Sequence, residues 1–496
     1  MPKDAEPGAP VGKAAGRITV VTLAVMNLTA VVSLRGLPAE AEYGMAAIAY
    51  YLFAAFCFLV PVAIVAAELA TAWPQRGGIF RWVGEAFGAR AGFLAIFLLW
   101  VQNVVWFPTV LTFGAVALAF AGPDQGWDEA LAANRFYTLT AVLAVYWLAT
   151  AIALRGVAAF TAVAKWGGLV GTIIPAALLI GFGIAYHLST GQSATPLTWS
   201  AAVPDLGRFD TLVLAASIFL FYAGMEMNAV HVRNVTRPER NYPLAILISS
   251  LAAVAILALG TLAVAMIVPR GEISLVLSLL LAFDAYFAHF GLAWLGPVVA
   301  VMLAFGVLGG VTVWVSGPSS GILAVGRAGY LPPVLQRTNA AGAPVAILLL
   351  QAGLVTLLSL LFVILPSVQA TYQILGQLTA ILYLVMYLMM FAAALVLRYR
   401  RDGAAPGAAR SYRVPGGRAG LWLFAGTGFA ASLLAMALSF VPPGQIAVGS
   451  PTAYIGLLAG GAVLFIALPM AIYALRKPHW HRPDAGFEPF SWERGA

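Results

Sequence analysis

The segment Ser33-Leu34-Arg35-Gly36-Leu37-Pro38 interrupts a hydrophobic run at residues 18–44. Glycine and proline are the poorest helix formers, and a charged side chain is rare in the apolar part of a membrane helix. A second hydrophobic run, 209–232, contains Phe221-Tyr222-Ala223-Gly224-Met225-Glu226, again a glycine beside a charge. The two interruptions lie about 190 residues apart, and paired broken helices in corresponding positions of two halves are typical of inverted-repeat membrane proteins.

The composition of the chain excludes a water-soluble protein. Of its 496 residues, 62% are hydrophobic and 9% are charged, whereas soluble proteins carry about 25% charged residues. The single cysteine, Cys57, excludes a disulfide framework, and the five histidines show no metal-ligand spacing. The net charge of +8 is spread between hydrophobic runs, so it does not indicate nucleic-acid binding. The sequence also lacks the phosphate-binding motif GxxxxGK[ST], which disfavours an ATP-driven pump.

Twelve runs are long enough to cross about 30 Å of hydrocarbon as helices of roughly 20 residues. We expect an all-α polytopic membrane protein, because helices satisfy their own backbone hydrogen bonds in lipid. The runs lie at residues 18–44, 46–70, 91–121, 134–154, 159–187, 209–232, 242–268, 292–325, 344–365, 370–397, 419–440 and 453–475.

The distribution of Lys and Arg predicts the orientation in the cell membrane. With the N-terminus in the cytoplasm, 22 of the 27 positive residues lie on the cytoplasmic side, and three, Arg135, Arg208 and Arg270, lie outside. Both termini are therefore expected to be cytoplasmic. The remaining two, Arg35 and Lys165, fall within hydrophobic runs, where an ionisable group is a candidate for function.

The expected organisation follows from these runs and from the two interruptions. We expect a cytoplasmic N-terminal tail without a cleavable signal peptide, two inverted repeats of five spans, two further spans and a short cytoplasmic C-terminal tail. The corresponding ranges are 1–17, 18–187, 209–398, 419–475 and 476–496.

Several quoted segments also carry a family resemblance. They are SLRGLPAEAEYG (33–44), AELATAWPQRGGIFRWVGEAFG (67–88), AKWGGLVG (164–171), FYAGMEMNAVHVRNVTRPERNYPLA (221–245), WVSGPSSGILA (314–324) and YLVMY (383–387). Together they resemble the amino acid–polyamine–organocation superfamily, and most closely its bacterial glutamate:GABA antiporter family. The resemblance implies a LeuT-like fold of five plus five spans, with discontinuous helices 1 and 6, and alternating access without ATP.

The chain departs from that antiporter family at two places. The family has a long C-terminal plug that blocks the cytoplasmic path, whereas only residues 478–496 follow Lys477, so we expect no plug. The family also has a glutamate one helical turn before the tryptophan of its eighth span. This chain has Gly310 before Trp314 at that place, which leaves the identity of the substrate open.

The two interruptions supply most of the expected substrate site. Helix-end amides attract anions, and the Arg35 guanidinium offers a fork that suits a carboxylate. Glu226 could attract an ammonium group, titrate during transport or anchor its half-helix. The alternative is that Arg35 pairs with Glu40, Glu42 or Glu226 and has a structural role. The candidate substrate-binding residues here are Ser33, Arg35, Gly36, Phe221, Tyr222, Gly224 and Glu226.

Three aromatic residues join the candidate substrate site because of the resemblance. Trp314 matches a tryptophan that lines the pathway in the eighth span of the family. Tyr383 and Tyr387 are four residues apart, so they share one face of a helix. Most of the aromatic residues of a membrane protein pack in the core or at the interfaces, and this is the alternative for all three.

Lys165 is the candidate coupling residue. The resemblance implies that the fifth span passes the first and eighth spans where sodium-coupled relatives hold a cation, and that a buried lysine ammonium replaces this ion. Gly167 and Gly168 follow it and suit close helix packing. The alternative is that Lys165 snorkels to the membrane surface.

These features predict a secondary active transporter of amino acids, or an amino acid/amine exchanger, that works as an antiporter or as a proton-coupled symporter. The expected partners are a small-molecule substrate, protons and the lipid bilayer, without a cofactor or metal. The alternative is a non-transporting sensor or a channel-like protein on the same fold. An enzyme is not expected, because the sequence shows no nucleophile, metal or paired-carboxylate constellation.

Overall fold

The computed structural model describes residues 19–73, 77–122, 124–204, 217–226, 235–365, 367–401, 412–443, 449–483 and 486–493. Within these ranges the protein is helical, and its strand-like pairing is limited to isolated bridges such as Ala328 with His481. Ten helical segments of the described chain are long and apolar enough to span a membrane. The prediction of an all-α polytopic membrane protein is confirmed.

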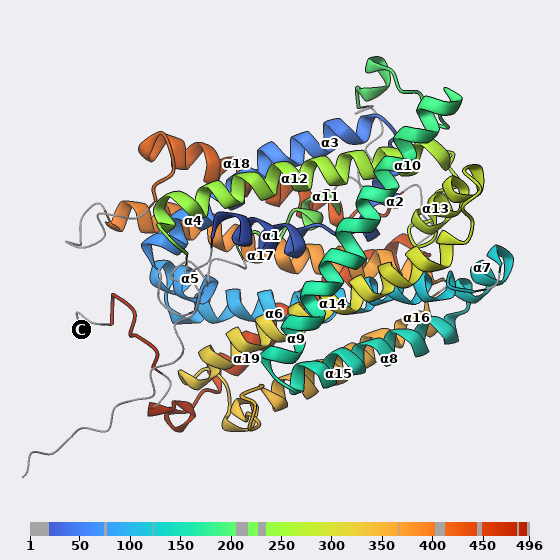
Figure 1. Ribbon diagram of the computed structural model, residues 1–496. Coiled ribbons are helices and arrows are strands. Elements are labelled where there is room, and N and C mark those ends of the chain that lie inside the picture. Colours follow the sequence, from blue (N-terminus) through green and yellow to red (C-terminus); the bar gives the residue numbers. More distant parts are fainter. Residues whose placement is uncertain are drawn as a thin grey trace, which may run out of the picture.

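Both predicted interruptions are breaks in the helices (Figure 1). Helix α1 (Val20–Val31) is followed by extended backbone at Val32 and Ser33, then by the short turn η1 (Leu34–Gly36) and helix α2 (Leu37–Ala41). Helix α11 (Ser217–Phe221) ends in a turn over residues 222–226, in which Gly224 has a φ of 114°. The rest of the run 209–232 lies outside the described residues.

The ten spanning segments agree closely with the predicted runs. The first consists of α3 (Ala46–Ala54), η2 (Ala55–Leu59) and α4 (Val60–Ala72), and another of α9 (Val157–Gly168), η3 (Leu169–Ile173) and α10 (Ile174–Thr190). The others are α6 (Ala89–Ala119), α8 (Arg135–Leu154), α12 (Pro238–Ile267), α14 (Leu295–Arg327), α15 (Val345–Ser359) with α16 (Leu361–Ile364), α17 (Val368–Arg401), α18 (Gly417–Ser439) and α19 (Pro451–Ala474).

Three short helices between the spans are not predicted by the sequence analysis, because they are too short to register as membrane runs. They are α5 (Ile79–Phe87), α7 (Gln125–Ala133) and α13 (Ser278–His289). Helix α5 lies between two glycines with positive φ, Gly78 at 50° and Gly88 at 91°. Asp124 caps α7 by accepting a hydrogen bond from the Trp127 backbone N–H.

Helix α6 forms the centre of the bundle. Of its most hydrophobic 18-residue stretch, 89% is buried, compared with 22% for α19 at the periphery. It packs against α5, α8, α14 and α17. In Figure 1 α6, α12 and α17 run roughly across the bundle and α14 crosses them obliquely. Helix α6 contacts both α14 and α17, which lie far from it in the sequence.

The fifth and eighth predicted spans meet through glycines. A Cβ atom on Gly167 of α9 would lie 2.7 Å from the Gly309 Cα atom of α14. The next glycine pair, Gly171 and Gly306, is also in backbone contact. Only small residues allow helix backbones to approach this closely, so these glycines fix the crossing of the two helices.

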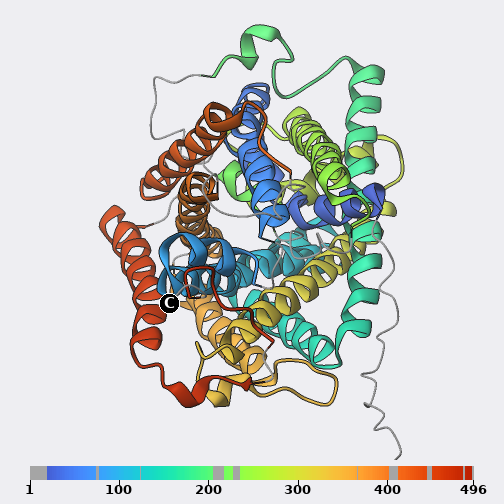
Figure 2. The ribbon, with the colours of Figure 1, turned by 90° about the vertical axis from the view of Figure 1, so that its left-hand side faces the viewer.

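The C-terminal segment 486–493 packs on α5 (Figure 2). Arg81 forms an ion pair of 2.7 Å with Glu85 and donates hydrogen bonds to the carbonyls of Glu488 and Pro489 at 2.6 and 2.9 Å. Glu85 accepts a hydrogen bond from the Ser491 backbone N–H. The sequence analysis describes this segment only as a short tail, whereas the structure docks it against the helix bundle.

Candidate functional site

Arg35 is buried in the first break, and no carboxylate in the described part of the chain forms an ion pair with it. Its side chain is 5% exposed, and its Nη1 donates hydrogen bonds to the Tyr372 hydroxyl at 2.9 Å and to the Thr109 hydroxyl at 3.5 Å. Among the described residues no ion pair joins Arg35 to Glu40, Glu42 or Glu226, and its Nε has no hydrogen-bond partner. A buried guanidinium with open donors is suited to an anionic ligand.

Aromatic rings surround the Arg35 guanidinium. Its Cζ atom lies 5.4 Å from the centre of the Trp106 ring and 5.8 Å from that of Tyr372, within cation–π range. Trp314 of α14 packs edge-on against Trp106, with 5.9 Å between the ring centres. Trp314 thus reaches the first break through Trp106.

Glu226 is buried in the second break and is held by two tyrosines of α17. The Tyr383 hydroxyl donates to its Oε1 at 2.6 Å, and the Tyr387 hydroxyl donates to its Oε2 at 2.5 Å. Tyr387 also accepts a hydrogen bond of 2.9 Å from the Gly224 backbone N–H. The two tyrosine rings stack with centres 4.8 Å apart, as their spacing on one helical face predicts. Glu226 is 3% exposed, and within the described chain no ion pair joins it to a cation.

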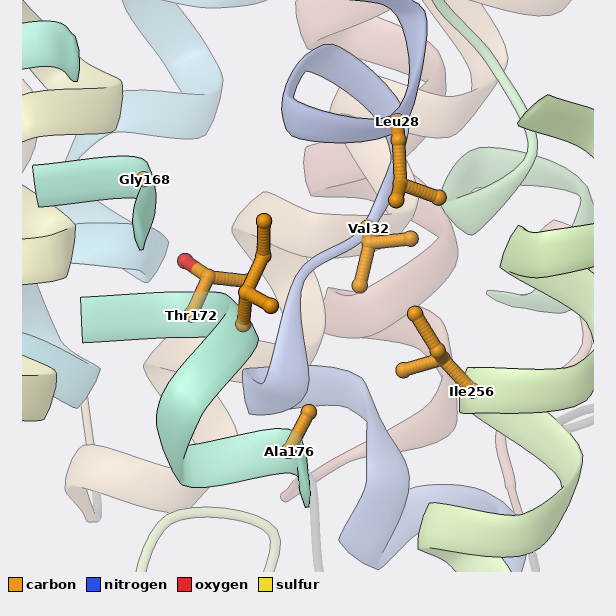
Figure 3. Close-up of a pocket in the computed structure, with 7 residues that line it drawn as sticks. Leu28, Val32, Gly168, Thr172, Ala176 and Ile256 are labelled. Carbon is orange, nitrogen blue, oxygen red and sulfur yellow. The ribbon is translucent and has the colours of Figure 1, made fainter. Parts of the chain in front are cut away.

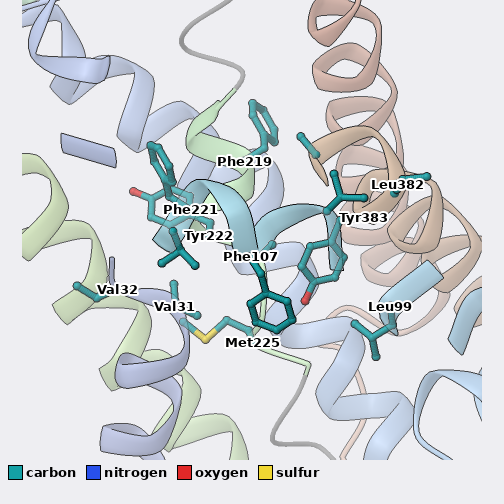
Figure 4. Close-up of a cluster of buried hydrophobic side chains, with 14 of the residues drawn as sticks. Val31, Val32, Leu99, Phe107, Phe219, Phe221, Tyr222, Met225, Leu382 and Tyr383 are labelled. Atoms are coloured by element: carbon teal, nitrogen blue, oxygen red, sulfur yellow. The ribbon is translucent and has the colours of Figure 1, made fainter. Parts of the chain in front are cut away.

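The two breaks touch each other. A Cβ atom on Gly36 would lie 2.5 Å from Cε1 of the Phe221 ring, so only glycine leaves room for this contact. Tyr222 is fully buried, and its hydroxyl donates to the Tyr51 carbonyl at 3.3 Å. Figure 4 shows Phe221, Tyr222 and Tyr383 among apolar side chains from several helices. The two buried charges, Arg35 and Glu226, thus belong to breaks that are in contact, and apolar side chains pack around that contact.

Most of the predicted substrate-binding residues lie in one region. Arg35 and Gly36 belong to the first break, and Phe221, Tyr222, Gly224 and Glu226 to the second. Tyr383 and Tyr387 bond to Glu226, and Trp314 joins through Trp106. Ser33 is half-buried in extended backbone just before η1, and its side chain caps no helix.

Lys165 does not join this region, and its predicted burial is wrong. The side chain is exposed, and its Nζ lies 5.6 Å from the centre of the Trp166 ring. Gly167 faces α14, and residues two apart on a helix point to different sides. The crossing of α9 and α14 therefore directs Lys165 away from α14 in this structure.

A small apolar pocket lies beside the first break (Figure 3). It is formed between α1, the π-helical segment η3 with the adjoining ends of α9 and α10, and α12, and a threonine hydroxyl is the polar side-chain group among its lining residues. Neither Arg35 nor Glu226 lines it, so it is separate from the charged site. The lining residues are Leu28, Val32, Gly168, Thr172, Ile173, Ala176 and Ile256.

The sequence analysis missed three residues of this region, Trp106, Thr109 and Tyr372. Trp106 and Thr109 lie within two residues of Pro108 inside the long run 91–121, and this proline was the available signal. Tyr372 lies eleven residues before Tyr383 on the same helix, outside the quoted motif. In the described part of the chain, no group of three or more His, Cys, Asp or Glu residues is placed to hold a metal ion.

The chain matches the family model described as amino acid permease over residues 18–464. It is 39% identical to an uncharacterized transporter of Legionella pneumophila over 455 residues, which cover 91% of this chain and 95% of that protein. It is 35% identical to a glutamate/gamma-aminobutyrate antiporter of Lactococcus lactis, with 87% of this chain and 85% of that protein covered.

A more distant match is a putrescine transporter of Haemophilus influenzae. It is 24% identical over 333 residues, which cover 67% of this chain and 72% of that protein. The Lactococcus and Haemophilus proteins are both named as transporters of amino acids or amines.

Proposed function

Because this chain belongs to the amino acid permease family, we propose that it is a secondary active transporter that exchanges amino acids, or an amino acid and an amine, by alternating access. The chain is a multi-pass membrane protein, and its similarity to a glutamate/gamma-aminobutyrate antiporter supports exchange. Proton-coupled symport is the other form of the same proposal.

One observation carries the proposal. Within the described residues, a buried arginine that is paired with no carboxylate and a buried glutamate that is paired with no cation occupy two helix breaks that touch through Gly36 and Phe221. Burying unpaired charges is costly, so such charges are retained in a membrane protein where they serve transport. An amino acid supplies both missing partners, a carboxylate for Arg35 and an ammonium for Glu226.

The fold proposed for this function has twelve spans in two inverted repeats, residues 18–187 and 209–398, followed by two further spans. The breaks after α1 and α11 support it, because discontinuous helices in corresponding positions form the substrate site in such transporters. We retain Lys165 of the fifth predicted span as the proposed coupling residue on the ground of the family resemblance, although its side chain is exposed beside Trp166 rather than buried against α14.

We propose that both termini are cytoplasmic, because the positive residues concentrate on that side. Trp199, which is 89% exposed, then lies outside the cell, and Lys477 lies inside. A cysteine at position 199 that an impermeant reagent does not label in intact cells, while a cysteine at position 477 is labelled, would show the opposite orientation.

The function is tested with purified protein in sealed liposomes. The probes are radiolabelled L-glutamate, γ-aminobutyrate, L-arginine, agmatine and putrescine, each at pH 5 and pH 7.5. An exchanger accumulates label only when the liposomes contain a counter-substrate, and a symporter does so only with an inward proton gradient. A channel equilibrates the label without either, and a sensor binds it without flux. Either of these last results would overturn the proposal.

A further inference from the structure

We propose that Tyr372 is a positioning residue for Arg35. Its hydroxyl anchors Nη1 of the guanidinium, so that the edge formed by Nε and Nη2 is available to a substrate carboxylate. This inference rests on the proposed function, in which Arg35 binds that carboxylate.

The side-chain hydrogen bonds that Arg35 makes with described residues are all on one side of the guanidinium. Both side-chain acceptors in the described structure, the hydroxyls of Tyr372 and Thr109, bind Nη1. The Nε atom is buried and has no hydrogen-bond partner among the residues that the structure describes. A carboxylate binds an arginine most strongly through two parallel N–H groups on one edge. With Nη1 occupied, the edge that can form two such bonds is the one between Nε and Nη2.

Tyr372 is attached to Arg35 at two points. Its hydroxyl oxygen accepts from Nη1 at 2.9 Å, and its hydrogen is directed to the Arg35 carbonyl oxygen at 3.5 Å. One phenol therefore links the arginine side chain to its own backbone. The Thr109 hydroxyl donates to the Trp106 carbonyl at 2.7 Å, which leaves its lone pairs for Nη1.

Aromatic packing keeps the guanidinium in this orientation. The Trp106 and Tyr372 rings both lie within 6 Å of its Cζ atom, at 5.4 and 5.8 Å. Arg35 and Tyr372 are 5% and 8% exposed, so water does not compete freely for these contacts. A guanidinium fixed before the substrate arrives loses less conformational entropy on binding, which favours affinity.

Tyr372 lies on α17, the helix that also contacts Glu226. The same helix carries Tyr383 and Tyr387, which hold Glu226. One helix therefore orients both buried charges, one near its start and the other near its middle. A change in the position of α17 alters the two ends of the substrate site together.

The test is a double-mutant cycle of Tyr372→Phe and Arg35→Ala. Binding is measured on purified protein with radiolabelled L-glutamate and γ-aminobutyrate as carboxylate probes, and with putrescine as a probe without a carboxylate. Tyr286→Phe is the matched control, because it removes a buried tyrosine hydroxyl that bonds to the Ala263 carbonyl, away from Arg35.

We expect Tyr372→Phe to raise the dissociation constant of the carboxylate probe about three- to tenfold, as the loss of one hydrogen bond predicts. The binding of putrescine, which has no carboxylate, should stay within about twofold of the parent, since only the carboxylate contact is disturbed, and Tyr286→Phe should leave the binding of all probes unchanged. In the Arg35→Ala background, Tyr372→Phe should have no further effect. If Tyr372→Phe fails to fold, the same cycle with Thr109→Val, which removes the other Nη1 acceptor, should weaken the carboxylate probe in the same way.

Other outcomes separate this inference from the proposed function. An unchanged dissociation constant in folded Tyr372→Phe, an equal loss for putrescine, or an effect that persists in the Arg35→Ala background overturns the positioning role alone. Where Thr109→Val replaces Tyr372→Phe, the same three results for Thr109→Val overturn the positioning role. Parental binding by Arg35→Ala, or a parent that binds neither carboxylate probe, overturns the carboxylate role of Arg35 and the inference with it.

Discussion

Gly36 of the first helix break lies directly against the Phe221 ring of the second. A Cβ atom at Gly36 would stand 2.5 Å from Cε1 and 2.6 Å from Cε2 of that ring. The contact joins two segments far apart in the chain, and each carries one of the buried charges, Arg35 and Glu226. The separation of these charges therefore depends on a position where no side chain fits.

Gly36→Ala should impair both folding and transport. The added methyl group must displace a buried aromatic ring, and overpacking of this kind costs about 1–3 kcal/mol. The melting temperature and the uptake rate in liposomes measure the effect. Gly353→Ala on α15 is the control, because its Cβ atom would have no neighbour within 4 Å. Equal melting temperatures and uptake rates for the two variants would show that the contact between the breaks is loose.

Arg35→Ala should weaken substrate binding more than it lowers stability. The hydrogen bonds of a charged group contribute about 1.5–3 kcal/mol, which corresponds to roughly ten- to a hundredfold in affinity. Equilibrium binding of the best probe from the transport panel measures this change, and the melting temperature serves as the check on folding. Parental affinity in stable protein would assign Arg35 a structural role.

Lys165→Ala should separate binding from transport. If the ammonium replaces a coupling cation, its removal leaves the substrate site formed, so binding should stay within about tenfold, or 1.4 kcal/mol. Exchange or proton-driven uptake should be mostly lost. Lys165→Arg should restore it only in part, because a guanidinium does not release its proton and has a different shape. An alanine variant that is folded and transports at the parental rate with the same pH dependence contradicts the coupling role.

Phe490→Ala should destabilise the protein through the docked C-terminal segment. Phe490 is fully buried against Gly84 of α5, and removing such a side chain costs about 3–5 kcal/mol. Thermal unfolding in detergent measures the loss. Phe136→Ala is the matched control, because Phe136 is 70% exposed. Indistinguishable melting curves for the two variants would show that the segment does not contribute to stability.

Asp284 of α13, which lies between the spanning segments, should make stability depend on pH. Burial raises its pKa to about 6, and the negative charges of Asp128 and Glu129 act in the same direction. The folded protein thus holds this proton more tightly than the unfolded chain. The contribution to stability is present at low pH and is lost as the pH rises from the unfolded value through about 6.

Asp284→Asn should therefore raise the melting temperature at pH 7.5 and change it little at pH 4.5. Glu272→Gln, which neutralises an exposed carboxylate in the preceding loop, is the control. An Asn variant with the same shift in melting temperature at both pH values would show that the ionisation of Asp284 does not matter for stability.

The sequence by itself determined the helical membrane class and the two breaks, and it supplied most of the residues proposed for the site. Both signals are local: hydrophobic runs of spanning length, and a glycine, Gly224, close to the charged Glu226. Such patterns can be recognised in the sequence before the fold is known. The stacking of Tyr383 and Tyr387 on α17 could also be predicted from the sequence, because residues four apart lie on the same face of a helix.

Only the tertiary structure decided which groups meet. Tyr372 bonds to Arg35 across 337 positions of sequence, and Glu85 accepts from Ser491 across 406. The tertiary structure also decided that the Lys165 side chain points away from α14. The glycines that bring α9 against α14 fix the rotation of α9 about its own axis. The physical reason is that periodicity defines the faces of each helix, whereas the partner of each face depends on how the helices pack together.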